Sequence, residues 1–362
     1  MPPDPVADPR NTAEPGSILT SALAPIVRVE AARSDNPWGL AHGIVAFGIQ
    51  FEADSGRPAW QEIGTLLEKV DNARGWDWPA EIEGRRVEPH DGMMARVLSA
   101  DPPPGNPKLK TDSDGPTLDV VIDGLRGALI MGDVSLRDLG WVLGASCSAV
   151  PIEDDQVRKE LEGAVKNAVA TLGTECQGIE DARQRGDQVL RKDKQGIFAH
   201  PCGGQHFLQG AVACAQNRIG GGDVAAQVRH QVDLHLWRFD AEMALYRQQY
   251  QRIDVTDPNG PALRLILDIQ QLKFAGHTAE TIALARQAEL YAPTELSGLT
   301  ERYRSALIAA DEAVARLGDA GVLHAMGVLR TNVYQSYLDI VGDGSHALHA
   351  IAVWDQAPPE HR

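Results

Sequence analysis

The sequence predicts an all-α fold, and three observations support that class. Helical stretches with suitable first and last residues follow one another from residue 36 to residue 354. Alternating runs of β-branched residues bounded by turn residues, which mark strands, are nearly absent. Aromatic residues make up only 5% of the chain, which is low for a sheet protein. A chain of 362 residues is long enough for one large helical domain.

The first half of the predicted domain opens with a well-capped helix. Asn36 is a typical N-cap residue, and Pro37 suits the first helical position. Further helices are predicted at about 58–73, 117–131, 135–145 and 154–172. A loop-rich insertion at 76–116 interrupts them, because prolines and glycines concentrate there; it leaves room for one short helix at about 93–98.

The second half reads as a more regular series of helices. They are predicted at about 201–217, 223–251, 262–275, 278–291, 299–317, 321–341 and 345–354. The apolar residues of the 262–275 helix surround most of its cylinder, and those of the 223–251 helix behave similarly. We therefore expect buried inner helices surrounded by outer helices that each have one solvent-exposed face.

The two ends of the chain are not expected to join this core. Residues 1–17 form a predicted disordered tether, because five prolines lie there among acidic and small residues. A single helical domain is then expected over 18–356, followed by a tail at 357–362.

Charge and hydropathy exclude several functional classes. With 50 acidic and 34 basic residues the formal charge is −16, which argues against a nucleic-acid-binding role and against docking on an anionic membrane. No apolar run reaches the roughly 18 residues that a membrane span needs, so no transmembrane segment is expected. The chain shows no basic-then-apolar signal segment. We expect a soluble protein, cytoplasmic by default, or exported or lipid-anchored if an upstream signal belongs to it.

Three segments place a histidine among small residues near a predicted helix start: NPWGLAHG at 36–43, HPCGGQHFLQG at 200–210 and GDGSHALHA at 342–350. This theme, together with helix pairs of similar length, resembles the α/α-toroid class, which includes prenyltransferase β-subunits, terpene cyclases and lanthionine cyclases. The resemblance covers about residues 36–354. It implies a barrel of paired inner and outer helices with its site at the mouth where the inner helices begin. Some members of the class hold zinc there with Asp, Cys and His.

Cys202 and His206 are the first candidate site residues. Pro201 is expected to start a helix, so that Cys202 lies among its unpaired N–H groups, where the helix dipole favours a thiolate. His206 follows one turn later on the same face. The pair can act as two zinc ligands, as a catalytic nucleophile and its base, or as ordinary packing residues.

His346 and His349 form a second candidate pair, with Asp343 close enough to orient a ring or to bind a metal itself. In a closed ring of helices the last helix lies beside the first, so this pair could face His42. The alternative is a short final helix capped by Ser345, with its histidines at the solvent-exposed end. His277 is expected to lie between two helices as part of a cap.

No complete catalytic signature is present: the sequence lacks GxxxxGK[ST], HExxH, CxxCH and GxSxG. Its four cysteines are too few and too scattered to predict a disulfide framework. From the cysteine and histidine residues near the predicted helix starts, we expect a metal-dependent or thiol-dependent enzyme with its site at one mouth of a helical barrel. Zinc is the candidate cofactor, and a small molecule or peptide is the expected ligand. The alternative hypothesis is a non-catalytic helical binding or scaffold protein.

Overall fold

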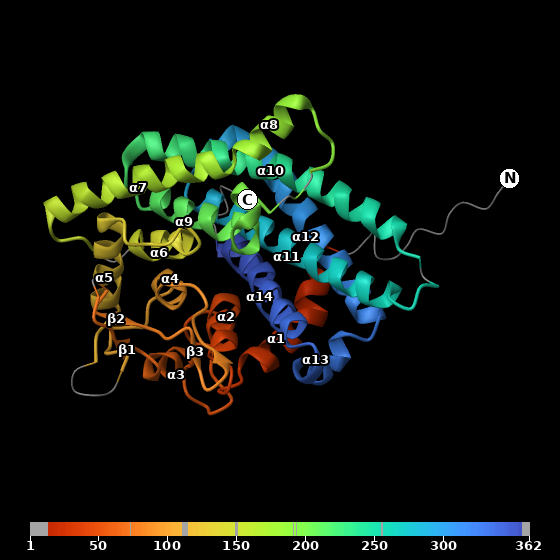
Figure 1. Ribbon diagram of the computed structural model, residues 1–362, viewed down its shortest axis with the longest axis horizontal. Helices are drawn as coiled ribbons and strands as arrows, with labels where there is room; N and C mark the ends of the chain where they lie inside the picture. The colour runs from red at the N-terminus through yellow and green to blue at the C-terminus, as the bar shows by residue number, and fades with distance from the viewer. Residues whose placement is uncertain are drawn as a thin grey trace.

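The computed structural model describes residues 14–356, apart from residues 73, 111–114, 149–150, 191, 193 and 255, and in this part the chain is helical almost throughout (Figure 1). The all-α prediction is confirmed. The described strands are two-residue pieces that form two small antiparallel hairpins, β1 (Glu68–Lys69) with β2 (Trp76–Asp77) and β3 (Glu81–Ile82) with β4 (Arg85–Arg86). None of the helices described is long and apolar enough to cross a membrane.

The helices follow one another in this order: a π-helix at Leu19–Leu23, α1 (Ala24–Ala31), α2 (Pro37–Phe47), α3 (Ala59–Thr65), α4 (Met93–Ala100), α5 (Leu118–Met131), α6 (Leu139–Ser146), α7 (Asp155–Glu175), α8 (Gln177–Arg185), α9 (Gln205–Gln216), α10 (Gly221–Arg252), α11 (Gly260–Gln287), α12 (Leu296–Asp319), α13 (Met326–Asn332) and α14 (Tyr334–Gln356). Short 3₁₀ turns lie at Gly196–Ala199, Pro201–Gly204, Pro293–Glu295 and Leu323–Ala325.

Local signals place several of these elements correctly. The Asn36 side chain accepts a hydrogen bond from the Gly39 N–H at 3.1 Å, so α2 is capped as predicted. The short helix predicted inside the loop-rich insertion is α4, which packs against α6, α2 and α5. The predicted tether falls outside the described residues up to position 13, and the predicted tail at 357–362 lies outside them too. At the start of the described chain, Gly16 N donates to the buried Asp311 carboxylate at 2.7 Å.

Helices α2, α14, α11, α9, α6 and α4 pack against one another in that order, and α4 packs back on α2. They form a closed cycle, which we call the inner ring. In Figure 1, α14 crosses the middle of the molecule beside α11 and α2. The remaining helices lie around the ring: α1 and α13 pack on α14, α12 on α11, α10 on α9 and α11, and α5 on α6. Through the contact of α2 with α14, the inner ring joins the start of the domain to its last helix.

The six helices of the inner ring run in the same direction. Two cavities lie along the ring, and the earlier residues of each helix line one of them while the later residues line the other. Thus α2 contributes Trp38 and His42 to the first cavity and residues 44–48 to the second. We call these the entry cavity and the exit-side cavity; they meet at Trp141, His206 and His346, which line both.

Two predicted helix breaks are wrong. Gly276 and His277 lie inside the continuous helix α11, and Gly342 to Gly344 lie inside the continuous helix α14. These glycines mark close contacts and not chain turns: a Cβ at Gly276 would lie 3.1 Å from the Ala347 side chain, and one at Gly342 would lie 2.4 Å from the Trp38 ring. Glycine was needed because α14 packs tightly between α11 and α2.

The expectation that the 262–275 helix is buried all round is also wrong in part. Burial is dense from Asp268 onward, where α11 enters the inner ring. Before that point Leu263 is 47% exposed and Ile266 is 52% exposed. The apolar pattern could not reveal that the first two turns of α11 extend beyond their neighbours.

Helices α6 and α9 are held unusually close together. A Cβ at Gly210 would lie 2.3 Å from the Gly140 carbonyl oxygen, and one at Gly140 would lie 2.5 Å from the Phe207 Cα. A disulfide joins Cys147 to Cys214 beside this contact. The spacing of the four cysteines did not predict this bridge, because its two cysteines are 67 residues apart and meet only through the packing of α6 and α9. It fixes α9 against α6, and with them His206 and Trp141, whose ring centroids are 3.8 Å apart.

A buried carboxyl in the loop-rich insertion gives a first testable prediction. Glu88 is 2% exposed; its Oε1 accepts from Met94 N at 2.6 Å, and its Oε2 has no hydrogen-bond partner among the described residues. Burial, and then the neighbouring Asp77 charge, raise the pKa of Glu88 well above its ordinary value. Because the pKa of Glu88 is higher in the folded protein than in the unfolded chain, the folded state binds this proton more tightly. The protonated Glu88 therefore adds to the free energy of unfolding at low pH, and this contribution is lost as the pH rises through the folded-state pKa.

Glu88→Gln is therefore expected to stabilise the protein by about 1 kcal/mol at roughly pH 8, because the amide keeps the shape without the buried charge. The gain should shrink toward roughly pH 5, where the native carboxyl holds its proton. Urea unfolding at several pH values measures both, with the exposed Glu83→Gln as control. A gain that is the same at every pH contradicts the assignment.

Candidate functional site

Cys202 occupies a strained turn at the entrance of α9. The sequence predicted it in the first turn of an α-helix, but Cys202 has φ 49° and Gly203 and Gly204 have φ 60° and 81°, so the segment is a left-handed turn and α9 begins only at Gln205. A cysteine at positive φ is uncommon and costly. Gly203 is needed because a Cβ there would lie 2.6 Å from an Arg238 nitrogen. The turn lets Cys202 line the entry cavity.

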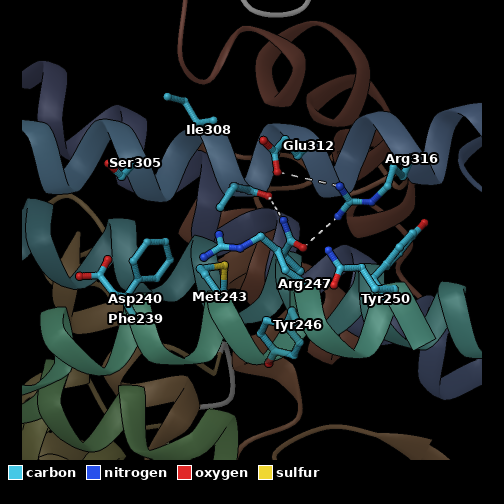
Figure 2. A pocket seen from close by; sticks show the side chains of 13 residues that line it. Phe239, Asp240, Met243, Tyr246, Arg247, Tyr250, Ser305, Ile308, Glu312 and Arg316 are labelled. Carbon is cyan, nitrogen blue, oxygen red and sulfur yellow. Dashed lines mark hydrogen bonds and ion pairs between the residues drawn. The ribbon is translucent and has the colours of Figure 1, made fainter. Parts of the chain in front are cut away.

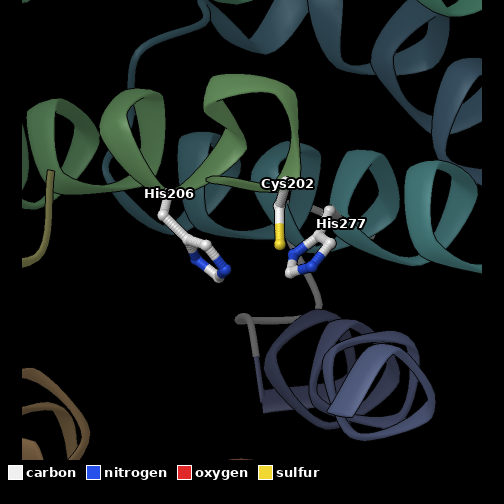
Figure 3. A group of neighbouring side chains, drawn as sticks. All are labelled: Cys202, His206 and His277. Atoms are coloured by element: carbon white, nitrogen blue, oxygen red, sulfur yellow. The ribbon is translucent and has the colours of Figure 1, made fainter. Parts of the chain in front are cut away.

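Cys202, His206 and His277 form a compact group in which one ligand atom from each lies within 4.8 Å of the others. Figure 3 shows the Cys202 sulfur between the two imidazole rings, with Cys202 and His206 coming from the α9 entrance and His277 from α11 behind it. His277, Glu280 and His346 form a second group of the same size that shares His277. The His277 and His346 ring centroids are 4.1 Å apart. Segments far apart in the sequence therefore meet here.

Three imidazoles in this cluster hold one ring nitrogen against a protein acceptor. The Nδ1 atom of His206 lies 3.1 Å from Gln209 Oε1, that of His346 lies 2.8 Å from Glu280 Oε2, and that of His42 lies 2.7 Å from the Trp38 carbonyl oxygen. In each ring Nδ1–H donates a hydrogen bond to this acceptor, so that Nε2 carries the lone pair. The Nε2 atom of His346 is buried and has no hydrogen-bond partner in the described structure.

The electrostatic surroundings keep these rings neutral. Burial, followed by the His346 ring, lowers the pKa of His42 to about 3. Burial, and then His277 and His346, lower the pKa of His206 well below its ordinary value. Burial also lowers the pKa of His346, although the Glu280 charge opposes this. Neutral imidazoles with a free Nε2 are the form in which histidine binds a metal ion.

Glu280 organises the cluster from behind. Its carboxylate accepts hydrogen bonds from His346 Nδ1 at 2.8 Å, from His349 Nδ1 at 2.6 Å and from Gln209 Nε2 at 2.7 Å. Burial alone raises the pKa of Glu280, but His346 and the other imidazoles outweigh it and hold the pKa well below the usual range. Glu280 thus stays ionised and, directly or through Gln209, fixes the rings of three histidines.

His277 differs from the other rings because it lies between acidic groups. Its Nδ1 is 3.6 Å from Glu280 Oε2 and its Nε2 is 3.5 Å from Asp343 Oδ1. Burial lowers the pKa of His277, but the charge of Cys202, with hydrogen bonding to Asp343, raises it well above its ordinary value. Without a metal, His277 is therefore the ring that holds a proton beside the Cys202 sulfur.

The structure brings together most of the residues that the sequence singled out. Cys202, His206 and His346 lie in the two groups, and His42 stands next to His346 with ring centroids 5.5 Å apart. His349 instead lies beyond Glu280, where its side chain lines the exit-side cavity. Asp343 contacts His277 and lies 3.6 Å from Lys273 Nζ.

Sequence reasoning missed His277 and Glu280 as site residues. It treated them as a capping pair because Gly276 precedes them. A signal was nevertheless present: His277 and Glu280 lie at i and i+3, so their side chains share one face of a helix.

The cluster forms the floor of the entry cavity, which has a volume of about 380 Å³. The walls are contributed by the starts of α2, α4, α6 and α9 and by the middle of α11 and α14; the lining includes Trp38, His90, Met93, Trp141, Lys273 and Asp339. This size suits a small ligand or the end of a larger one.

A separate cavity of about 640 Å³ lies outside the ring between α10 and α12 (Figure 2). Its polar side chains are largely satisfied by the protein: Arg316 donates to Asp268 at 2.6 Å and to Gln271 at 2.9 Å, and Gln271 donates to the Ala309 carbonyl at 2.8 Å. The candidate metal-binding cysteine and histidines lie in the inner ring and not in this cavity.

Comparison with known protein families, with curated protein sequences and with solved structures finds no match to this chain.

Proposed function

We propose that this chain is a zinc-dependent enzyme whose metal is bound at the floor of the entry cavity by Cys202 Sγ and the imidazoles of His206 and His277, which leaves the fourth zinc position open for water or substrate. The observation that carries the proposal is the arrangement of ring nitrogens: His206 turns Nδ1 to Gln209 and leaves Nε2 free, and the neighbouring His346 does the same with Glu280. Metal-binding histidines characteristically show such outer contacts. Thiolate and imidazole together suit Zn²⁺.

Zinc at such a site polarises a carbonyl group or lowers the pKa of a bound water. The surrounding residues have separate tasks. Glu280 and Gln209 orient the rings, Asp343 lies beside His277, and Trp38 and Trp141 cover the cluster from the α2 and α6 sides. A metal held by Cys202 and His277 would take the place of the proton that the His277 ring otherwise holds.

The inner ring also supports the α/α-toroid arrangement that the sequence resembles. The ring closes, its helices run in one direction, and the cluster lies where most of them begin. The Cys147–Cys214 disulfide supports export to an oxidising compartment over cytoplasmic residence, because such bonds are rare in a reducing cytosol.

Metal analysis of protein purified without an affinity tag tests the proposal. About one zinc per chain is expected. Cys202→Ser and His206→Ala should lose it, whereas Cys176→Ser, which changes a buried free thiol outside the cluster, should keep it. In Co²⁺-substituted protein, a thiolate-to-cobalt absorption band that disappears in Cys202→Ser identifies the sulfur ligand. Native protein without zinc, copper or iron, and with an unfolding temperature unchanged by chelators, contradicts the proposal.

A second candidate function is thiol catalysis by Cys202 with His277 as base. The observation that favours it is the Asp343 carboxylate at 3.5 Å from His277 Nε2, which orients the ring as the third member of a triad does. The alkylation rate separates the two functions. A metal ligand is alkylated at least about 10-fold more slowly after zinc loading, whereas a nucleophile in a protein that binds no metal reacts much faster than Cys176, whose pKa burial raises to about 12.

A further inference from the structure

The exit-side cavity, about 620 Å³ in volume, lies on the other side of the cluster from the entry cavity. His206, Glu280 and His346 form part of its wall, so a molecule bound there reaches the proposed metal centre. Apolar side chains line much of the remainder, including Ile44, Phe47, Leu284 and Val353. The cavity has the size and mixed lining typical of a small-molecule site.

Three hydrogen-bond donors on this wall lack protein partners. The Arg96 side chain forms no hydrogen bond or ion pair with any residue in the described part of the chain; only its backbone is paired, with Gly92 and Ser99. Trp141, 7% exposed, and Ser148, 6% exposed, carry a buried Nε1 and a buried Oγ without partners there. Buried donors are ordinarily satisfied, and leaving one without an acceptor costs free energy.

The three donors are neighbours. Trp141, Gly144 and Ser148 follow one another at spacings of three and four residues, which places them near one face of α6 and its end. A Cβ at Gly144 would lie 2.5 Å from both Cδ and Nε of Arg96. The Arg96 side chain therefore lies against α6 at Gly144, a residue that is three positions after Trp141 and four before Ser148.

The acidic residues of the cavity do not neutralise Arg96. Glu280 exerts an electrostatic effect on Arg96, but its oxygens already accept from His346, His349 and Gln209. Asp101 accepts from the Ile49 N–H at 2.8 Å. In a chain with a net charge of −16, an arginine left without a carboxylate inside a cavity is unexpected.

We propose that the exit-side cavity binds a small organic carboxylate, with its anionic group held by Arg96, Trp141 Nε1 and Ser148 Oγ, its apolar part against Ile44 and Leu284, and its other end beside the cluster. A guanidinium matches the planar carboxylate. A singly charged anion fits better than a phosphate dianion, because the cavity lining carries two carboxylates, Asp101 and Glu280, beside its two arginines, Arg28 and Arg96. The inference deepens the proposed function by naming a substrate class, but carboxylate binding itself needs no metal.

Calorimetric titration of the full chain with phenylacetate, phenylacetamide and phenyl phosphate tests this. Phenylacetate is expected to bind at least about 10-fold more tightly than the neutral amide. Arg96→Met should remove that preference and leave the weak binding of the amide unchanged, and Arg96→Lys should restore part of it. Arg28→Met is the matched control, since Arg28 lines the rim of the same cavity but stacks on Phe47. It should change the affinity for phenylacetate by less than about 3-fold.

The same titrations in zinc-loaded and chelator-treated protein separate this inference from the proposed function. Arg96-dependent binding in both forms supports the inference whether or not zinc binds. Phenylacetate binding that requires zinc and is unchanged in Arg96→Met overturns the inference but not the proposed metal centre. Equal affinity for acid and amide, tighter binding of phenyl phosphate, or no detectable phenylacetate binding overturns it as well. Circular dichroism and thermal unfolding establish that each variant is folded.

Discussion

Glu280→Ala is expected to reduce the free energy of unfolding by about 3–5 kcal/mol and to weaken zinc binding by about 10- to 100-fold. The carboxylate is buried and accepts from His346, His349 and Gln209. Its removal leaves the buried His346 donor and the part-buried His349 donor without that acceptor, whereas Gln209 Nε2 keeps Thr281 Oγ1 at 3.2 Å. It also frees the His346 ring to rotate. Urea unfolding measures the first effect, and competition with a zinc chelator measures the second.

Two further variants sharpen this prediction. Glu280→Gln keeps the volume but offers one acceptor oxygen and an NH₂ group, so it should recover part of the stability and little of the zinc affinity. Glu301→Ala, which removes an exposed carboxylate on α12, should change stability by less than about 0.5 kcal/mol. If Glu280→Ala is as stable as Glu301→Ala, the carboxylate does not organise the histidines.

The double variant Cys147→Ala/Cys214→Ala is expected to lose roughly 4 kcal/mol of stability, because the disulfide closes a loop with a sequence separation of 67 residues. The bridge limits the unfolded chain and fixes α9 against α6. Chemical unfolding with and without a reducing agent checks this: reduction should destabilise the native protein and leave the double variant unchanged. If the reducing agent leaves the free energy of unfolding of the native protein unchanged, the Cys147–Cys214 bond is not present.

Much of the candidate site could be predicted because its local chemistry is unusual. Cys202 and His206 stood out through the glycines between them, and these glycines are needed for the left-handed turn and the approach of Arg238. His42 and His346 were proposed to meet because a closed ring brings the first and last helices together, and α2 does pack against α14. Their ring contact follows from that packing.

Other parts of the site could not be derived from local patterns. Gly276 resembles a helix end, yet α11 continues through it, and this made His277 look like a capping residue. His349 follows His346 by three residues, but Glu280 inserts at that level, so only His346 keeps a ring nitrogen toward the cluster. Arg96 showed no local signal, because its lack of a carboxylate partner depends on which helices surround it.

The sequence by itself determined the helical class and the lack of an apolar run long enough to span a membrane, and it singled out Cys202 and most of the imidazoles that the structure brings together. These properties depend on composition and on spacings within a single turn, which act over a few residues. Only the tertiary structure decided which glycines end helices and which allow contacts, that Cys147 joins Cys214, and that Glu280 lies behind the histidines. Those outcomes depend on packing between helices distant in the chain, where close approach and the pairing of buried charges select one arrangement.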